Sequence, residues 1–412
     1  MSQIISKPEG VNGLTAISAT TTSPENAAQK WLEAAKQILP VYLAVHLAFF
    51  VISVLALLFT HGDFDPIRYP LNSLWQSWNR WDTAHFIHIA QFGYDNKLET
   101  AFFPFYPLLM KVVAHFTHHS ELVAGLVVSN ISLLVLSVVL YQLVSEDFDQ
   151  ACAHRTVLYL LVFPTAFFLA AAYSETLFLC FAVLSFYQMR RGKWWLAGLF
   201  GLLASLTRPN GLFLVIPFCF EYLYQHGFSL KRFRFDMVSI GLIPAGIALF
   251  ALYCWHRFGD PLEFSVVQSV PGWDKHLAWP WVGIVLDLQL IQSRGTILDY
   301  VSLRNMLDLI LDLFLLLPLL VALIGPWKFP GRLWSYVLLG LAFWLFFNLY
   351  VRIGSGADPL SSMSRYMVEV FPAFIFLAVL GKHRTVHACY VMISSSMLFF
   401  MLTQFLNGRW IL

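Results

Sequence analysis

The chain has 412 residues, of which 58% are hydrophobic and 12% charged, and its mean hydropathy is +0.66. Soluble domains carry about 25% charged residues, and no soluble core of this size buries so much apolar surface. The composition therefore excludes a soluble enzyme and a disordered scaffold and predicts an integral membrane protein. The formal net charge of +2 provides no broad basic surface, so we expect no nucleic-acid partner.

Residues 1–36 open with a polar segment rich in Ser, Thr and Gly, and no apolar run follows a basic start. This pattern is typical of a flexible tail and not of a cleaved signal peptide, and we expect the tail to be cytoplasmic. Residues 37–412 would then form one membrane domain. The five cysteines are scattered without CxxC spacing, which favours small packing residues over a zinc or redox site.

Apolar runs dominate the membrane domain. A helix that crosses a bilayer needs about 20 mostly apolar residues, and the chain contains about eleven candidate runs, some short enough to require tilted helices. The expected fold class is therefore an all-α integral membrane protein with about eleven transmembrane helices. The predicted spans are 38–60, 122–144, 157–172, 176–189, 194–206, 212–224, 238–255, 306–324, 333–351, 367–380 and 386–406.

The short run 102–116 decides the predicted sidedness, because it contains two prolines and a lysine. Basic connectors near residues 190–193, 231–234, 328–332 and 382–384 belong on the cytoplasmic side. All four fall there, together with the tail, only if 102–116 does not cross the membrane. We therefore expect a juxtamembrane helix lying in the interface at this run.

This sidedness gathers the polar motifs on the outer, non-cytoplasmic face. The first outer loop spans residues 61–120, and a second large outer loop spans 257–305. Shorter outer turns lie around 173–175, 208–211 and 352–366. Nearly every short polar motif of the chain falls in one of these loops, so we expect the chemistry to converge on one side of the membrane.

The first outer loop carries an aspartate between aromatic residues. Asp82 follows Arg80 and Trp81 and begins a stretch that ends at Gly93. One interpretation is helix capping, with Asp82 accepting the free N–H groups of the first turn and Gly93 ending the helix. The other is a carboxylate that removes a proton from a hydroxyl acceptor, with Arg80 and Trp81 ordering a sugar or a lipid headgroup. The spacing favours neither.

Two outer turns interrupt apolar runs with polar residues. Glu175 is either a solvated helix end or a functional carboxylate. Arg208 and Asn210 separate two short apolar runs. Non-helical backbone at that depth is tolerated only where protein buries it or where it lines a wet cavity. We therefore favour a functional role for Arg208 and Asn210.

The second large loop and the following segment add further candidates. Asp260 and Gln268 lie in a Trp-rich loop that either anchors at the interface or covers a cleft. Arg365 either pairs with Glu369 four residues later or binds a phosphate through its planar guanidinium.

Two other features favour packing over chemistry. His85 and His88 share a helix face, but without a tight ligand spacing they are better interpreted as packing histidines than as metal ligands. The aromatic segment 102–107 is better interpreted as an interfacial belt, although its prolines could also present the preceding loop rigidly.

The motifs, taken in chain order, resemble the GPI mannosyltransferase 2 (PIG-V) family and its bacterial relatives. Each motif is weak alone, and the ordered set from Arg80 to Tyr366 is fairly specific. The motifs that carry the resemblance are Arg80-Trp81-Asp82, His88-Ile89-Ala90, Gly93-Tyr94, residues 102–107, 163–164 and 172–178, Thr207-Arg208-Pro209-Asn210-Gly211, residues 259–262 and Ser364-Arg365-Tyr366.

The resemblance implies a membrane glycosyltransferase of the GT-C superfamily with an acidic catalytic residue in the first outer loop. It implies a polyprenyl-phosphate sugar donor, mannose as the sugar, and a lipid-linked or glycan acceptor. We expect Asp82 to act as general base. No cofactor is required, and a divalent metal is compatible with the pattern, although no second carboxylate follows Asp82 at DxD spacing. The expected substrate-binding residues are Arg80, Trp81, His85, Glu175, Arg208, Asn210, Asp260, Gln268, Arg365 and Tyr366.

The expected location is a bacterial inner membrane or the endoplasmic reticulum membrane, with the active site on the non-cytoplasmic face. The alternative function is a multi-span transporter or lipid flippase, which predicts ionisable groups near the bilayer midplane and two halves with paired broken helices. The polar candidates instead cluster at outer helix ends and the halves show no duplication, so the enzyme is favoured. A structural membrane subunit leaves the first outer loop unexplained.

Overall fold

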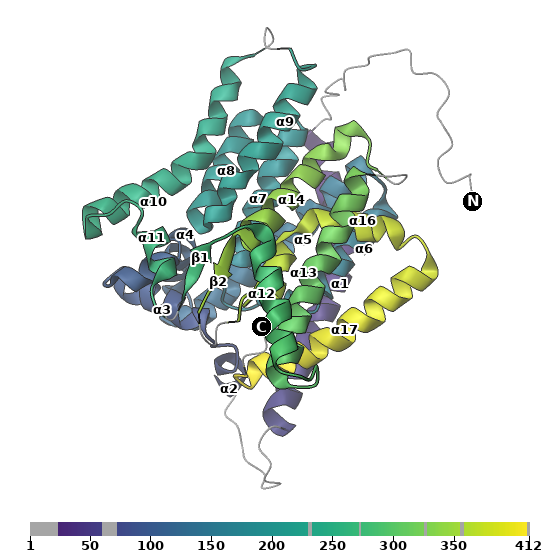
Figure 1. Ribbon diagram of the computed structural model, residues 1–412. Coiled ribbons are helices and arrows are strands. Elements are labelled where there is room, and N and C mark those ends of the chain that lie inside the picture. Colours follow the sequence, from purple (N-terminus) through teal and green to yellow (C-terminus); the bar gives the residue numbers. More distant parts are fainter. Residues whose placement is uncertain are drawn as a thin grey trace.

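The computed structural model describes residues 24–59, 72–229, 233–271, 273–324, 328–354 and 358–409, with side chains from residue 28 onward. Within these ranges the chain is almost entirely helical (Figure 1). The strands in these ranges are β1 (Lys275–Leu277) and β2 (Tyr350–Arg352), which pair as one antiparallel ribbon. The predicted all-α class is therefore confirmed.

The long helices form the body of the molecule, and short elements surround one end of it. The longer helices are α1 (Pro24–Phe59), α5 (Glu121–Asp147), α6 (Gln150–Leu161), α7 (Glu175–Arg190), α8 (Trp194–Thr207), α9 (Val215–Gln225), α10 (Leu242–Phe258), α12 (Pro280–Ser293), α13 (Tyr300–Leu323), α14 (Trp334–Leu349), α16 (Phe371–Leu380) and α17 (Arg384–Leu406). The shorter elements are α2 (Asn72–Gln76), α3 (Asp82–Phe92), η1 (Lys97–Ala101), α4 (Phe105–Ala114), η2 (Ala166–Leu169), η3 (Pro209–Leu214), η5 (Phe235–Gly241), α11 (Glu263–Val266), η6 (Val267–Ser269), η7 (Gly331–Leu333), α15 (Met363–Tyr366) and η8 (Met367–Glu369).

By length and composition, six helices of the described chain could span a membrane, or seven if the bent pair Met363–Glu369 and Phe371–Leu380 is one span. The predicted count of about eleven is not confirmed. Several predicted spans correspond to helices that are too short to be counted as membrane-spanning, such as the 16-residue α7, whose side chains are mostly buried inside the protein. Their apolar character therefore reflects packing against other helices as much as contact with lipid.

Helix boundaries depart from the prediction at three places. Helix α1 begins at Pro24, well before residue 38, and residues 1–23 of the predicted tail lie outside the described residues. The predicted span 157–172 is not one helix, because α6 ends at Leu161, before Pro164. Proline lacks an N–H and disfavours a helical residue before it. The second large loop, predicted without a helix, contains α12.

The run 102–116 contains the ten-residue helix α4. Ten residues reach about 15 Å, half of a hydrocarbon core of about 30 Å. This length fits the predicted juxtamembrane helix. The helix is held on α5 by Tyr106, whose hydroxyl donates a 3.0 Å hydrogen bond to the carbonyl of Gly125.

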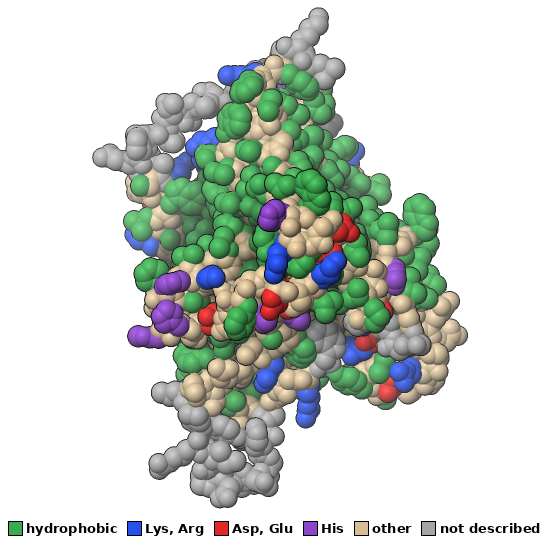
Figure 2. All heavy atoms as spheres, turned by 90° about the vertical axis from the view of Figure 1, so that its left-hand side faces the viewer, with side chains coloured by type: hydrophobic (Ala, Val, Ile, Leu, Met, Phe, Trp, Pro, Cys, Tyr) green, Lys and Arg blue, Asp and Glu red, His purple; other side chains and the backbone are tan. Residues whose placement is uncertain are grey.

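The two ends of α7 carry different polar clusters. At its C-terminal end, Arg190 contacts Asp147 at the end of α5 and lies 2.9 Å from Glu221 of α9. Glu175, at its N-terminal end, lies in a buried network directly behind the pocket described below. The pocket therefore lies at the end of α7 opposite the Arg190 cluster. Figure 2 shows hydrophobic side chains covering the upper part of one face, while charged and histidine side chains gather lower down.

Candidate active site

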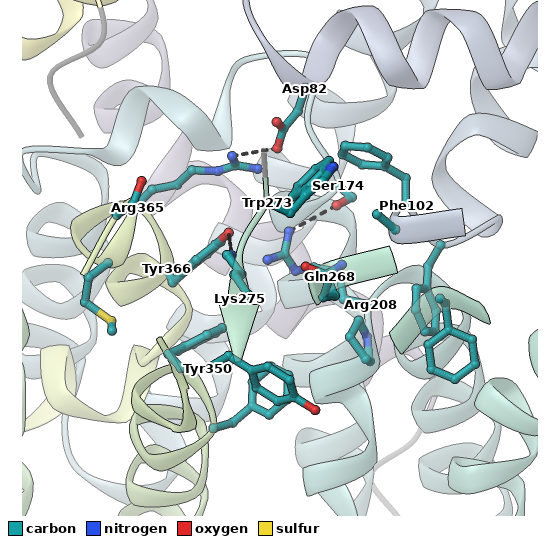
Figure 3. Close-up of a pocket in the computed structure, with 18 of the residues that line it drawn as sticks. Asp82, Phe102, Ser174, Arg208, Gln268, Trp273, Lys275, Tyr350, Arg365 and Tyr366 are labelled. Atoms are coloured by element: carbon teal, nitrogen blue, oxygen red, sulfur yellow. Dashed lines mark hydrogen bonds and ion pairs between the residues drawn. The ribbon is translucent and has the colours of Figure 1, made fainter. Parts of the chain in front are cut away.

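An open pocket lies between α3, the turn after α8, the β1–β2 ribbon and α15, with about 1180 Å³ of space that includes open solvent (Figure 3). Five of the residues predicted from sequence line it: Asp82, Arg208, Gln268, Arg365 and Tyr366. They come from four separate parts of the chain. The predicted convergence of distant motifs therefore occurs in the structure.

Asp82 is the first residue of α3, and its carboxylate is held by an arginine. Its Oδ2 lies 2.6 Å from Nη1 of Arg365, and no partner for Oδ1 is found among the described residues. The capping interpretation is wrong, because Trp81 occupies the N-cap position and no side-chain cap bond forms. Gly93 ends the helix as expected, with a positive φ of 74°. The Asp82 carboxylate therefore faces the pocket and not the helix terminus.

Behind the pocket wall, Glu175 is fully buried and joins both arginines. Nε of Arg365 donates a 2.6 Å hydrogen bond to Oε1 of Glu175, and Nη1 of Arg208 lies 3.0 Å from the same oxygen. Nε of Arg208 lies 3.2 Å from Glu369, which also accepts a hydrogen bond from Asn210. Two guanidinium groups and three carboxylates, including Asp82, thus form one network.

The suggested pairing of Arg365 with Glu369 is wrong, because Glu369 contacts Arg208 instead. Arg365 belongs to α15, and Glu369 ends the following 3-10 turn η8. Residues four apart share a face in an α-helix, but the tighter 3-10 turn rotates them away from each other. The change of helix type therefore separates the two side chains.

Aromatic rings surround the Arg365 guanidinium. Its central carbon lies 4.4 Å from the ring centroid of Tyr173, 5.2 Å from Phe168 and 5.6 Å from Tyr366. Rings at these distances attract a cation through their negative faces. The Tyr173 hydroxyl also donates a 2.9 Å hydrogen bond to the carbonyl of Arg80. One tyrosine thus ties Arg365 to the loop that carries Asp82.

Strained backbone precedes both Asp82 and Arg365. Trp81 has φ 44° and Ser362 has φ 66°, a region that residues other than glycine rarely adopt. Each such residue costs about 1–3 kcal/mol and persists only where surrounding contacts hold it. Near Ser362, the N–H of Ser364 donates a 2.8 Å hydrogen bond to Asp308, and Thr165 donates one of 2.8 Å to the Ser364 carbonyl.

Six predicted site residues lie outside the pocket lining. Glu175 and Asn210 lie in the buried network behind it. Arg80 donates to backbone carbonyls of α17, including a 3.3 Å bond to Phe405, and Trp81 packs on the Phe405 ring at 5.2 Å. Asp260 caps a turn by accepting a 2.8 Å bond from the N–H of Leu262. His85 is the sixth residue.

His85 stacks on Phe102 with ring centroids 4.7 Å apart. Its Nδ1 lies 3.4 Å from Oε1 of Glu99. This hydrogen bond raises the pKa of His85 above the ordinary histidine value. His85 thus supports Phe102, which does line the pocket. Among the described residues, no group of three or more His, Cys, Asp or Glu side chains is arranged to hold a metal ion.

Three charged residues of the site are not among the predicted site residues, although Glu369 was considered as a partner of Arg365. Glu369 completes the arginine network. Lys275 of β1 and Arg352 of β2 line the pocket. The only sequence signal for Lys275 was its position close to Trp273 in a Trp-rich outer loop. Nothing in the sequence shows that residues 275–277 pair with residues 350–352.

Comparison with known proteins supports the family resemblance. Residues 67–255 match the family model described as mannosyltransferase (PIG-V). GPI alpha-1,6-mannosyltransferase 2 of Cricetulus griseus is 33% identical over 236 residues, which cover 51% of this chain and 44% of that protein. The Homo sapiens protein of the same name is 33% identical over 230 residues, with the same coverage. GPI mannosyltransferase 2 of Schizosaccharomyces pombe is 25% identical over 259 residues, covering 61% of this chain and 54% of that protein.

The chain spans less than half the length of the mammalian relatives. Among solved structures, ArnT of Cupriavidus metallidurans with undecaprenyl phosphate aligns at a TM-score of 0.49 and 14% identity, covering 90% of this chain and 76% of that one. The Archaeoglobus fulgidus oligosaccharyltransferase in the apo form gives 0.45 and 12%, covering 90% and 56%. Residues 67–255 are therefore similar to the PIG-V mannosyltransferase family, which confirms the resemblance that the motifs in this range indicate.

Proposed function

We propose that this protein is a membrane glycosyltransferase that moves mannose from a polyprenyl-phosphate donor to a hydroxyl group of a lipid-linked or glycan acceptor. The observation that carries the proposal is the Asp82 carboxylate, which lines an open pocket while a buried arginine holds one of its oxygens. The names of the matched relatives support mannose as the sugar. Asp82 would be the general base.

The proposed reaction has one chemical step. Oδ1 of Asp82 takes the proton of the acceptor hydroxyl, whose oxygen forms a bond to the anomeric carbon of the sugar. The bond between that carbon and the phosphate oxygen breaks, and its electron pair leaves with polyprenyl phosphate. The configuration at the anomeric carbon is inverted. A carboxylate held in place beside the pocket contributes through orientation as well as basicity.

The arginine network would fix the geometry of this base. Arg365 binds Asp82 on one side and Glu175 on the other, and Arg208 binds Glu175 and Glu369. Because the two guanidinium groups are shared among three carboxylates, we assign them first to positioning Asp82.

The remaining predicted residues divide by position. Gln268 and Tyr366 line the pocket and are proposed to contact the donor or acceptor. Glu175 and Asn210 lie behind the wall, so they are proposed to act through the arginines and not on the sugar directly. Trp273 lines the pocket where Trp81 does not, which makes Trp273 the better candidate for stacking on a sugar ring.

The test is Asp82→Asn, which keeps the shape of the side chain and removes the base. We expect transfer of labelled mannose from polyprenyl-phosphate mannose to a membrane lipid extract to fall about a hundredfold or more. Asp95→Asn is the matched control, because Asp95 is an exposed carboxylate near the end of the same helix and pairs with His88. Near-normal transfer by a correctly inserted Asp82→Asn protein would retire the mechanism.

Transport is the second candidate function, and one observation favours it. Asp312 lies buried within α13, a helix able to span the membrane, and accepts a 3.0 Å hydrogen bond from Asn348 of α14. Ionisable residues inside spanning helices often mark transport pathways. The same assay separates the candidates, because an enzyme leaves labelled mannose on a new acceptor, whereas a carrier moves intact donor across sealed vesicles.

A further inference from the structure

The β1–β2 ribbon brings two positive charges to the pocket wall. Lys275 and Arg352 are direct partners across the antiparallel ribbon, and both line the pocket. Like charges placed directly opposite each other on paired strands destabilise the pairing. A negatively charged ligand beside Lys275 would lower that cost.

Lys275 is not neutralised by the protein around it. Its Nζ lies 3.2 Å from the hydroxyl of Tyr366 and 5.1 Å from the centre of the same ring. No carboxylate pairs with it among the described residues. In contrast, Arg365 and Arg208 each contact two carboxylates.

Arg352 is oriented by the loop that precedes Lys275. Its Nε donates a 3.1 Å hydrogen bond to the carbonyl of Trp273. The ribbon is itself held against α12, where Gly283 packs so closely that an added Cβ would lie 3.2 Å from Val351. The two cations are therefore carried by a small supported platform and not by a free loop.

The proposed reaction needs positive charge that the arginine network does not supply. The two guanidinium groups of that network are shared among three carboxyl groups, so the network offers no surplus positive charge. The donor's phosphodiester carries one negative charge, and the departing phosphate monoester gains a second. A cation beside the phosphate stabilises this growing charge.

The ribbon also lies on a suitable side of the pocket. Figure 3 shows Lys275 entering from the ribbon beside Tyr366, whereas Asp82 enters from α3. Displacement with inversion requires the attacking oxygen and the leaving phosphate to lie on opposite faces of the anomeric carbon. A base from α3 and a phosphate ligand from the ribbon meet this requirement better than two groups on one helix.

We propose that Lys275 and Arg352 form the binding point for the lipid-linked phosphate, before and after the sugar leaves. This inference rests on the proposed function for the identity of the donor. It assigns phosphate binding to the ribbon, while Arg365 and Arg208 position the carboxylates.

The experiment measures binding of a short-chain polyprenyl phosphate and of the matching uncharged polyprenol to the purified full chain in phosphatidylcholine nanodiscs. We expect Lys275→Gln and Arg352→Gln each to raise the Kd for the phosphate about tenfold, as for loss of one charge-assisted contact. The Kd for the polyprenol should not change. Lys275→Arg should retain most of the affinity, and Lys111→Gln, at an exposed lysine of α4, should match the unmodified protein.

Each other outcome overturns a defined part of the proposal. An unchanged Kd for the phosphate in both Gln variants would remove the ribbon from phosphate binding and leave Asp82 chemistry intact. Equal weakening for the phosphate and the polyprenol would assign the ribbon a structural role. Failure of the unmodified protein to bind the phosphate would contradict both this inference and the proposed donor. Competition by phosphatidylglycerol nanodiscs would identify a bulk lipid headgroup as the ligand.

Discussion

At the scale of single residues, Arg365 determines the geometry of the site. It is 4% exposed and joins Asp82 of α3 to Glu175 of α7. A buried ion pair gains little net stability, because desolvation offsets the attraction between its charges. Removing one partner is different, since it leaves a buried charge uncompensated. The value of Arg365 therefore lies in holding two carboxylates from distant segments in one place.

We expect Arg365→Gln to lower the free energy of unfolding by about 3–5 kcal/mol, because Glu175 then loses a buried partner. Thermal unfolding in detergent would measure the loss. Adding Glu175→Gln to the Arg365→Gln variant should recover part of the lost stability, because it removes the carboxylate charge that Arg365 no longer compensates. Arg294→Gln is the control, because Arg294 is 46% exposed and lies 4.0 Å from Asp299, and exposed pairs contribute about 0–1 kcal/mol. Equal losses in the two single variants would contradict this account.

At the scale of helices, α8 and α10 pack closely through glycines. A Cβ added to Gly246 of α10 would lie 2.5 Å from the carbonyl oxygen of Leu202 in α8. One added to Gly198 of α8 would lie 2.3 Å from the carbonyl oxygen of Ser239 in η5, the turn that leads into α10. Small residues allow helix backbones to approach in a membrane, where the hydrophobic effect does not drive helices together. This contact positions the end of α8, and therefore Arg208 directly after it.

Gly246→Ala should destabilise the protein, because the carbonyl of Leu202 belongs to the backbone and must move to admit the new methyl group. We expect a loss of about 1–3 kcal/mol, the usual cost of overpacking, measured as a lower Tm. Gly241→Ala is the matched control at the start of the same helix, because a Cβ there meets no atom within 4 Å. If the Gly246→Ala variant has the same Tm as the control, then α8 and α10 can move apart at little cost and the predicted overpacking is wrong.

At the scale of the whole molecule, polar groups gather at two ends. One end holds the Arg190 cluster and connectors such as residues 190–193, and the other holds the pocket and the ribbon. Positively charged short loops favour the cytoplasmic side. The pocket should therefore open on the non-cytoplasmic side, where a polyprenyl-phosphate sugar and its acceptor would meet.

Single cysteines test this orientation in a variant that lacks the five native cysteines. Lys193→Cys lies at the exposed turn after α7, and Ser293→Cys lies at the exposed end of α12. In sealed vesicles with the cytoplasmic face outward, a membrane-impermeant thiol reagent should label Lys193→Cys directly. It should label Ser293→Cys only after detergent opens the vesicles. The reverse pattern would place the pocket in the cytoplasm.

The membrane class and most helix positions were predictable, because apolar runs of bilayer length have a strong composition signal. The number of spans was not, since runs such as 176–189 are equally apolar when other helices bury them, as in α7. The break after Leu161 had a local signal in Pro164, because proline disfavours a helical residue before it. Helix α12 was not predicted, because the aromatic residues of this outer loop suggested an interfacial anchor or a cover over a cleft.

By itself, the sequence determined that Asp82, Arg208 and Arg365 stand out, because charged residues at the ends of apolar runs are costly and need a reason. It did not decide which of them touch. Only the tertiary structure placed Arg365 on Asp82 and Glu369 on Arg208, moved Arg80 and Trp81 onto α17, and brought Lys275 beside Arg352. Side-chain pairing between segments far apart in the chain depends on helix packing and backbone rotation, which no local pattern encodes.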